Sequence, residues 1–510
     1  MLKRIISSIT VLALVISSFM LTSTLAFANT SLDADAWGEQ AIVAPEAGKL
    51  IGAGYIDVKF KNNLDKASTY SVYVDGKLQK TVNATEEEIL TVEFYTTAVS
   101  AHTAYIVATT EDGTTVQTPE DKFYVTKKGI CVNTNDMGAA VDPADLNCGW
   151  YYNWGYRSFK EQNYTNKKFD NLEFVPMIWG IPSVAFNKIF ESTNNQGYKF
   201  MLGYNEPDLQ WESDVSYGKA ANDWNYNFVK YKDKMRLGSP SVSYFPSMNN
   251  AWWPVYWNAL GASGRNETSF IALHNYQKFY DGKESALQYL EALDATYEKY
   301  RKPIWLTEFA VWKFDKSDKS GAAKTQEFMK IVLKGLNQRS YVERYSWFSP
   351  SYEEKAASSS SLFVYSTGEI TLPGKIYAQI GNPAGYPSKT YGVSSDISTD
   401  TSVKSCIGSI KTTLYGIYGK KKAFKYDIKS VRGAAGYQLT YSLNKKFSKK
   451  KKYKTKTINI KPSSSNAKMG TVKKLKKKKT YYAKVRAYKK FGGKTYYCKW
   501  SGREKCKTKK

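Results

Sequence analysis

Eight short apolar runs, separated by longer segments with helical spacing, constrain the fold of this chain more than any other feature. They occupy residues 129–132, 149–154, 174–180, 199–206, 236–241, 270–276, 303–309 and 344–349. Strands that alternate with helices form parallel sheets, and eight such units in about 250 residues fit a closed barrel. We therefore expect residues 128–385 to fold as a (β/α)8 (TIM) barrel.

The chain has 510 residues, which leaves room for further domains on both sides of the predicted barrel. Residues 31–127 contain short runs of alternating polarity that are separated by Asn, Asp and Gly clusters. The pairs Asp75-Gly76 and Asp112-Gly113 indicate hairpin turns, because type I′ turns need positive φ angles. This pattern predicts an immunoglobulin- or fibronectin-like β-sandwich.

A segment with few large apolar residues, 386–414, is predicted to be a linker. Strand-like alternation returns over residues 415–510. The strings GAAGYQLTYSLNKKF and TYYAKVRAY in this part of the chain resemble fibronectin type III domains. The expected architecture is therefore multidomain, with a central (β/α)8 barrel between an N-terminal β-sandwich and a C-terminal fibronectin type III-like β-sandwich.

Residues 1–28 have the pattern of a secretory signal peptide. Lys3 and Arg4 precede an apolar stretch, and Ala26-Phe27-Ala28 forms a small-residue processing site. The alternative is an uncleaved membrane anchor. After this segment the sequence has no apolar run of the length that a membrane helix needs. We expect a secreted protein without a transmembrane segment after processing, and an association with the cell wall fits the same pattern.

The chain has five cysteines and two histidines. Cys131 with Cys148, and Cys498 with Cys506, are the pairs that could form disulfides, and the odd number leaves at least one thiol over. Neither the cysteine spacing nor the two histidines indicates a zinc site. We expect no metal and no cofactor.

The formal charge of +28 is concentrated in the C-terminal part of the chain. Residues 421–510 hold 32 Lys and Arg against 2 Asp and Glu, so the other 420 residues are nearly neutral, with 42 basic and 44 acidic side chains. This segregation predicts an anionic partner for the C-terminal domain, such as an anionic cell-wall polymer. No nucleic acid is expected for an exported protein. The alternative is a solvated spacer whose lysines only maintain solubility.

Two glutamates follow apolar runs at positions that suit catalysis. Glu206 ends the fourth run and Glu308 the seventh, so both should lie at the carboxyl end of the barrel strands, where barrel active sites lie. Hydrolysis of a glycosidic bond without a cofactor needs two carboxyl groups that flank the bond. Asn205, directly before Glu206, is suited to hydrogen-bond the 2-hydroxyl of the sugar. The pattern indicates a glycosidase.

The motifs LGYNEPD, FVPMIWG, YYNWG, LHNY and WLTEF together resemble glycoside hydrolase family 128. The resemblance covers roughly residues 128–385. It implies a retaining mechanism and β-1,3-glucan as the substrate, with Glu206 as the general acid/base, Glu308 as the nucleophile and Asn205 as a sugar-binding residue. We take endo action as the working expectation, although the sequence leaves endo and exo action open.

Further side chains are expected around the two carboxylates. His274 and Tyr276, at the end of the sixth run, are placed to donate hydrogen bonds near Glu308. Aromatic rings that follow the strands are candidates for sugar stacking, and about half of them should instead be core residues. The substrate-binding candidates are Asn205, His274, Tyr276, Trp179, Trp347, Trp154 and Trp312. Trp211, Trp252 and Trp253 are expected to extend the cleft. Asp208 and Glu212 follow the acid closely and either support the site or lie on the surface, two alternatives that the sequence leaves open.

Two alternatives remain open at this point. A non-catalytic glycan-binding or cell-wall adhesion protein could keep the cleft without hydrolysis, although the presence of both carboxylates counts against it. A glycosidase of the same clan could act on another β-linked polysaccharide. Product analysis on β-1,3- and β-1,4-glucans separates these alternatives.

Overall fold

The computed structural model of the chain describes most residues from Trp37 to the C-terminus. These are residues 37, 40–64, 66–133, 141–248, 250–277, 282–311, 319–348, 350–351, 360–364, 367–393, 407–408, 410–431, 434–448, 455–461, 467–491 and 494–510. The predicted signal peptide and Trp312 lie outside this set. Two compact units are present: one comprises the described residues up to Lys49 with 55–94 and 102–123, and the other comprises 50–54, 95–101 and the described residues from Tyr124 on. Among these residues, none of the helices is both long and apolar enough to span a membrane.

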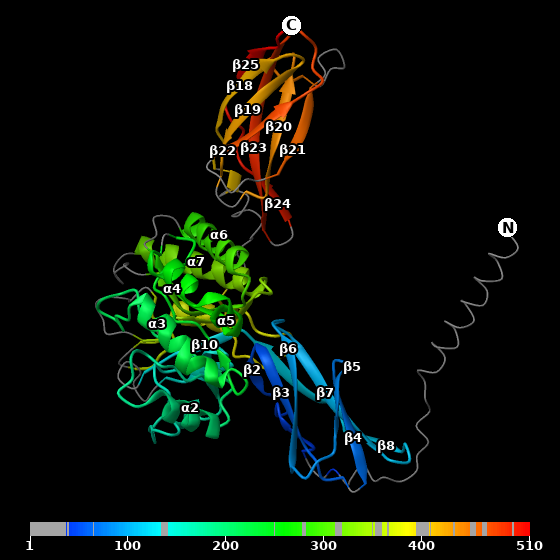
Figure 1. Cartoon of the computed structure of the whole chain (residues 1–510), viewed down its shortest axis with the longest axis vertical. Coiled ribbons are helices and arrows are strands. Elements are labelled where there is room, and N and C mark those ends of the chain that lie inside the picture. Colours follow the sequence, from blue (N-terminus) through cyan, green and yellow to red (C-terminus); the bar gives the residue numbers. More distant parts are fainter. Residues whose placement is uncertain are drawn as a thin grey trace, which may run out of the picture. The chain divides into compact units, whose positions relative to one another are not determined.

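The first unit is built from antiparallel strands (Figure 1). One sheet has the order β1 (Ile42–Ala44), β3 (Gly54–Lys61), β6 (Ile89–Thr96). The other strands are β4 (Ala67–Val74), β5 (Lys77–Asn83), β7 (Ala101–Thr110) and β8 (Thr115–Gln117), paired in the order β8-β7-β4-β5.

Side chains from the two sheets of this unit meet in a common core. Buried and partly exposed residues alternate along β3 and β7, as expected for strands with one buried face. Phe60 of β3 packs on Tyr70 of β4, with ring centroids 5.4 Å apart. The predicted turn at Asp75-Gly76 joins β4 to β5, and both of its residues have positive φ, as a type I′ turn requires.

The second unit contains parallel strands in each of the eight predicted apolar runs. Their bounds are β10 (Lys128–Cys131), β11 (Trp150–Tyr152), β12 (Glu173–Phe174), β13 (Phe200–Met201), β14 (Arg236–Leu237), β15 (Ile271–Gln277), β16 (Ile304–Val311) and β17 (Val342–Trp347). Ahead of them, β2 (Leu50–Gly52) pairs in parallel with the end of β9 (Asp121–Thr126).

The pairings of these eight strands run around a closed circuit. Six strands form one sheet in the order β12-β11-β10-β17-β16-β15, and β13 pairs with β14. Parallel bridges join Gly238 to Phe270 and Val242 to Leu273, which links the β14 segment to β15. A further bridge joins Met177 to Leu202, which links the β12 segment to β13.

Helices occupy the segments between the strands. Short 3-10 helices, η2 (Pro143–Leu146) and η3 (Lys167–Phe169), precede β11 and β12, where the sequence leaves little room. The remaining helices are α2 (Phe186–Asn195), α3 (Tyr217–Asp223), η4 (Trp224–Phe228), η5 (Val229–Tyr231), α4 (Trp252–Ala259), α5 (Gly261–Glu267), α6 (Gly282–Tyr300), α7 (Lys319–Asn337) and α8 (Leu372–Gln379).

Two hydrophobic clusters lie on the two faces of the strand circuit. The inner cluster consists of Cys131, Trp150, Tyr152, Val175, Met177, Phe200, Leu202, Phe270, Ala272 and Trp305. The outer cluster joins strand residues such as Tyr151 to helix residues such as Phe190 and Phe328. Successive side chains of a strand point to opposite faces, so Trp150 and Tyr152 face inward while Tyr151 packs outward against Phe159 and Phe169.

The C-terminal part of the second unit is a further all-β region (Figure 1). One sheet has the order β18 (Leu414–Lys420), β19 (Ala423–Lys429), β22 (Ala467–Val472). The other has the order β21 (Lys456–Ile460), β20 (Gly436–Ser442), β23 (Thr480–Phe491), β24 (Lys494–Tyr497), and β25 (Glu504–Lys507) also pairs with β23. Phe424 of β19 contacts Tyr441 of β20 and Tyr481 of β23, so the two sheets share a core.

The two disulfides that the sequence allowed are absent from the described residues, in which Cys131, Cys148, Cys498 and Cys506 are free thiols. Cys131 belongs to the inner cluster and Cys148 to the outer one, so the strand layer separates the two sulfur atoms. Each thiol instead donates to a backbone carbonyl, Cys131 to Trp347 and Cys148 to Gly129.

Candidate active site

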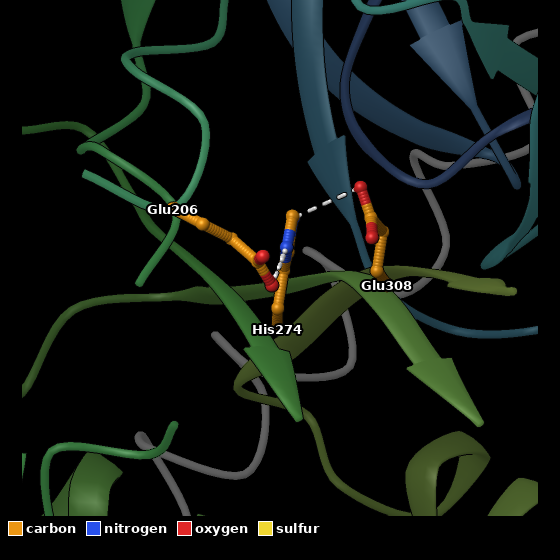
Figure 2. Close-up of side chains that lie close together, drawn as sticks. All are labelled: Glu206, His274 and Glu308. Carbon is orange, nitrogen blue, oxygen red and sulfur yellow. Dashed lines mark hydrogen bonds and ion pairs between the residues drawn. The ribbon is translucent and has the colours of Figure 1, made fainter. Parts of the chain in front are cut away.

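Three ionisable side chains from separate strands meet at one end of the strand circuit (Figure 2). Glu206 follows β13, His274 lies in β15 and Glu308 lies in β16. Nδ1 of His274 is 2.9 Å from Oε1 of Glu206, and its Nε2 is 3.4 Å from Oε1 of Glu308. All three residues are at most 7 % exposed, so the charges interact in a largely desolvated setting.

The two predicted carboxylates converge. A carboxylate oxygen of Glu206, a ring nitrogen of His274 and a carboxylate oxygen of Glu308 all lie within 4.8 Å of one another. Among the described residues, this is also the one group of three such side chains that could hold a metal ion. The imidazole of His274 lies between the two carboxylates and bonds Glu206 through Nδ1.

Glu206 is held in an unusual backbone conformation. Its φ is +39°, in the left-handed region that residues with a Cβ seldom adopt, and Trp154 across the cleft has φ +59°. The amide of Glu206 donates to the carbonyl of Ser241 at 2.8 Å, and its own carbonyl accepts from Leu209. Such strain concentrates at functional sites, where surrounding structure must stabilise it.

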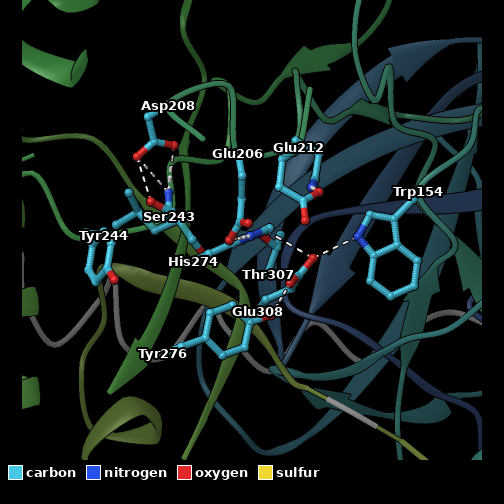
Figure 3. A network of polar contacts seen from close by, with 12 residues as sticks. Trp154, Glu206, Asp208, Glu212, Ser243, Tyr244, His274, Tyr276, Thr307 and Glu308 are labelled. Atoms are coloured by element: carbon cyan, nitrogen blue, oxygen red, sulfur yellow. Dashed lines mark hydrogen bonds and ion pairs between the residues drawn. The ribbon is translucent and has the colours of Figure 1, made fainter. Parts of the chain in front are cut away.

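Glu308 is surrounded by hydrogen-bond donors (Figure 3). Its Oε1 accepts from the hydroxyl of Tyr152 and from the indole Nε1 of Trp154, each at 2.8 Å. Its Oε2 accepts from the hydroxyl of Tyr276. Three donors directed at one carboxylate fix its orientation in the site.

Glu206 has a different electrostatic environment. Burial raises its pKa above 4.5, and the negative charge of Glu308 raises it further, whereas the hydrogen bond and charge of His274 act in the opposite direction. The pKa of His274 is itself raised, because the charges of Glu308 and Glu206 outweigh the burial of the ring. The net effect favours the protonated form of Glu206 relative to an ordinary glutamate.

Polar side chains behind Glu206 fix the loops that carry it. Asn205 donates from Nδ2 to Oε2 of Glu212 at 3.1 Å. The carboxylate of Asp208 accepts from the backbone amide and hydroxyl of Ser243 and from Asn250. Asp208 thus ties the loop after β13 to the loop after β14, and Asp208 and Glu212 both have defined partners.

The carboxylates open into a cleft of about 800 Å³. It is lined by Asn133, Asn153, Trp154, Trp179, Asn205, Glu206, Leu209, Trp211, Glu212, Ser243, Tyr244, Tyr276, Glu308 and Phe348. Trp179 is 42 % exposed and Trp211 77 % exposed, so both rings offer surfaces to a ligand.

Not all of the predicted aromatic residues reach this cleft. Trp154 and Trp179 line it, whereas Trp347 does not. Trp347 is fully buried: its indole donates to the carbonyl of Ser360, and its ring packs against Phe309 and Phe328 on the outer face of β17. The expectation that Trp347 binds sugar is therefore wrong, and the next residue, Phe348, lines the cleft instead.

The two adjacent tryptophans after β14 also differ from expectation. Trp252 and Trp253 begin helix α4 and lie outside the cleft lining. Trp253 is fully buried, and the indole of Trp252 donates to the carbonyl of Val215. The sequence had placed both in a loop that extends the cleft, but their apolar surface instead joins the helical layer.

Sequence reasoning missed Tyr152, whose hydroxyl contacts Glu308. A signal was present, because Trp150, Tyr152 and Trp154 alternate along one run and strand periodicity places alternate residues on the same face. Tyr244, Asn153 and Asn133 were also missed. They lie in loops, where no periodicity indicates the direction of a side chain.

Residues 129–377 match the family described as glycosyl hydrolase catalytic core. The match supports a glycoside hydrolase. It extends from β10 into α8 and includes every residue of the Glu206, His274 and Glu308 cluster.

Individual proteins are similar to about half of the chain. Alkali-sensitive linkage protein 1 of Schizosaccharomyces pombe is 27 % identical over 260 residues, which are 49 % of this chain and 44 % of that protein. The chain thus spans less than half the length of this curated relative. Among solved structures, a family 128 (subgroup I) endo-β-1,3-glucanase of Amycolatopsis mediterranei, in complex with laminaripentaose, is 29 % identical, with 50 % of this chain and 100 % of that chain covered and a TM-score of 0.42. A family 128 (subgroup III) curdlan-specific exo-β-1,3-glucanase of Blastomyces gilchristii is 27 % identical, with 50 % and 98 % covered and a TM-score of 0.40.

Proposed function

We propose that this protein is a retaining glycoside hydrolase that cleaves β-1,3-glucan, and that its strand circuit with the intervening helices is a (β/α)8 barrel. The observation that carries the proposal is the approach of the Glu206 and Glu308 carboxylate oxygens to within 4.8 Å at the base of an aromatic-lined cleft. The sequence motifs that resemble family 128 supply the substrate class. We further propose that the C-terminal sheets form a fibronectin type III-like domain.

The separation of the carboxylates favours retention over inversion. Retaining glycosidases hold the two carboxyl groups about 5 to 5.5 Å apart, whereas inverting enzymes need about 6.5 to 9.5 Å to admit a water molecule. A closest oxygen pair within 4.8 Å fits the shorter range. There is then room for the anomeric carbon between the groups but no room for an additional water.

The environments of the two glutamates assign their roles. The buried Glu206, whose pKa is raised, is suited to hold a proton and to donate it to the leaving oxygen. Glu308, whose two oxygens accept three hydrogen bonds, is held in a fixed orientation that suits attack on the anomeric carbon. The glycosyl–Glu308 ester that forms is hydrolysed by a water from which Glu206 removes a proton.

His274 lies between both groups. Its Nδ1 hydrogen-bonds Oε1 of Glu206, and its Nε2 lies 3.4 Å from Oε1 of Glu308, so the ring orients Glu206 and is within reach of the charge of Glu308. As Glu308 loses its charge on forming the ester, the attraction that raises the pKa of His274 weakens. The negative charge that raises the pKa of Glu206 also disappears, which favours the switch of Glu206 from acid to base.

We propose endo action on the internal bonds of the polymer. Trp179 and Trp211 present exposed rings in the cleft besides Trp154 at the carboxylates, so more than one sugar can stack in it. A time course of products from linear β-1,3-glucan tests this proposal. A ladder of oligosaccharides at early times supports endo action, and glucose alone from the start contradicts it.

Two further proposals concern the setting of the enzyme. The pattern of residues 1–28 supports export after removal of a signal peptide, and the mature protein recovered from the growth medium should then begin after Ala28. The basic residues after position 420 support an anionic cell-wall polymer as a second partner. Intact residues 1–28 in the mature protein would contradict export by cleavage.

Rescue with azide separates the two catalytic roles. The substrate is an aryl β-laminaribioside whose leaving group needs no general acid. The Glu206→Ala variant should still form the ester on Glu308 with it, and attack of azide on this ester should yield the β-glycosyl azide. The Glu308→Ala variant should instead yield the α-glycosyl azide, because azide attacks from the face that Glu308 vacates. The same anomer from both variants contradicts the assignment. Absence of hydrolysis by the wild type favours a non-catalytic glycan-binding protein.

A further inference from the structure

The outer face of the β20–β21–β23–β24–β25 sheet carries a row of cationic and aromatic side chains. Along β23, Tyr482, Lys484, Arg486 and Tyr488 are partly exposed, whereas the residues between them are buried. Strand periodicity therefore places these four side chains on one face, directed away from the core. We call this row the β23 stripe; the strand that carries it is labelled in Figure 1.

Aromatic rings from neighbouring segments hold the cations of the β23 stripe in place. The guanidinium of Arg486 lies 3.9 Å from the ring centroid of Tyr497 and 4.6 Å from that of Trp500. The ammonium of Lys484 lies 4.6 Å from Trp500 and 4.9 Å from Phe447. Such cation–π contacts fix the direction of long side chains that would otherwise be mobile in solvent.

Gln438 occupies only some of the N–H donors of Arg486, which leaves others for a ligand. Its Nε and Nη2 both donate to Oε1 of Gln438 on the adjacent strand, at 3.0 and 2.8 Å. A guanidinium has five N–H donors, so Gln438 uses only part of the set. A planar group that is already oriented loses little entropy when it binds a carboxylate.

The charges of the β23 stripe are not balanced by the domain itself. Lys484 and Arg486 contact the same ring, and the positive charge of Arg486 adds to burial in lowering the pKa of Lys484. Residues 421–510 contain only two acidic residues. Asp427 lies on β19 in the other sheet, and Glu504 pairs with Ala483, whose side chain faces the core.

We propose that the β23 stripe binds a linear polyuronate, a polysaccharide that carries a carboxylate on each sugar. The unbalanced cations provide charge complementarity, and the preoriented guanidinium matches a carboxylate. The partly exposed amide side chain of Gln438, directly beside Arg486 on β20, suits sugar hydroxyls. Arg486 and Lys484 already engage faces of Tyr497 and Trp500, which disfavours a nucleic acid that needs those rings for base stacking.

This proposal rests on the anionic cell-wall polymer proposed above as a second partner, for which it names the chemical class and the binding face, and it does not depend on the hydrolase activity. Binding of the full-length mature protein to polygalacturonate is measured by titration calorimetry at several salt concentrations. Fully methyl-esterified polygalacturonate keeps the sugar backbone without the charge and should bind at least about tenfold more weakly. Polyphosphate and single-stranded DNA test whether any polyanion suffices.

Variants locate the site on the sheet. The double variant Lys484→Gln/Arg486→Gln should lose about tenfold or more in affinity for polygalacturonate. The control Lys425→Gln/Lys473→Gln removes two exposed charges from the other sheet of the same domain and should change affinity less than about threefold. Arg486→Lys keeps the charge but loses the planar fork, and should bind less tightly than the wild type.

Three outcomes would overturn the proposal. Equal losses in the double variant and its control would show that diffuse charge, and not this face, binds the polymer. Tighter binding of polyphosphate or DNA than of polygalacturonate would exclude a polyuronate as the ligand. Absence of binding by the wild type at low salt would exclude the site altogether. Circular dichroism and hydrolytic activity on β-1,3-glucan should be unchanged in all of these variants, which separates a binding defect from misfolding.

Discussion

Nδ1 of His274 lies 2.9 Å from Oε1 of Glu206, and this contact couples the proton of the acid/base to a buried imidazole. The same ring approaches Oε1 of Glu308 with its other nitrogen. A single side chain from β15 therefore lies close to both carboxylates, and its removal should change how Glu206 titrates.

The first prediction concerns pH. His274 lowers the pKa of Glu206, so His274→Ala should raise that pKa further and move the alkaline limb of kcat/KM to higher pH, together with a loss of activity. The other histidine of the chain, His102, bonds to Asp75 in the first unit and provides the control. The His102→Ala profile should match that of the wild type. If the alkaline limb of the kcat/KM profile stays in place or moves to lower pH in His274→Ala, the coupling between His274 and Glu206 is contradicted.

The same contacts make stability depend on pH. The pKa values of Glu206 and His274 are both raised in the folded state, so the native protein binds more protons than the unfolded chain above the ordinary pKa of each group. The two groups contribute to the free energy of unfolding at low pH, and this contribution is lost as the pH rises through their raised pKa values in the folded state. In urea titrations, the stability of the wild type relative to Glu206→Gln/His274→Asn should therefore fall as pH rises, and a constant difference would contradict this expectation.

The donors around Glu308 should matter for rate. Tyr152→Phe and Tyr276→Phe each remove one hydrogen bond to the carboxylate and should lower kcat about tenfold to hundredfold. Tyr244 also lines the cleft, and the described structure shows no hydrogen bond from its hydroxyl to Glu308. Tyr244→Phe therefore serves as the matched control and should retain kcat within about threefold. Equal losses in all three variants would show that the hydroxyls act on the substrate and not on Glu308.

Two tryptophans should respond in opposite ways to truncation. Trp347→Ala should lower the free energy of unfolding by about 3 to 5 kcal/mol, because it leaves a cavity between the strand layer and α7. Trp179→Ala should leave stability nearly unchanged and raise KM for β-1,3-glucan, because the ring is exposed in the cleft. Urea unfolding and steady-state kinetics on both variants test the distinction, and the reverse pattern would contradict the corrected role of Trp347.

A buried lysine should be important for folding. The ammonium of Lys128 donates to the carbonyls of Leu146, Tyr377 and Ala378 and to the side chain of Asn382. Lys128→Met leaves these acceptors buried without a donor and should cost about 3 kcal/mol or more of stability. The exposed Lys188 on α2 provides the control, since Lys188→Met should change stability by less than about 0.5 kcal/mol. Similar unfolding midpoints for both variants would contradict the structural role of Lys128.

Local patterns in the sequence predicted the strands and the two glutamates, but not the direction of every side chain. The apolar runs locate each strand because parallel strands are buried on both faces. Burial on both faces also removes the polar–apolar alternation that would show which face a residue occupies. All residues of β17 are buried, so its sequence does not show that Trp347 faces outward. The contacts of His274 with both carboxylates depend on closure of the strand circuit, which joins residues more than thirty positions apart. No local pattern reports such a distance.

Release of reducing sugar from linear β-1,3-glucan tests the central claim most directly. The mature protein is compared with Glu206→Ala and Glu308→Ala, and with Glu191→Ala on the exposed face of α2 as the control. The account predicts release by the wild type and by Glu191→Ala, and a loss of at least about a thousandfold in the other two variants. Release that survives in Glu308→Ala, or no release by the wild type under any condition in which it is folded, would contradict it.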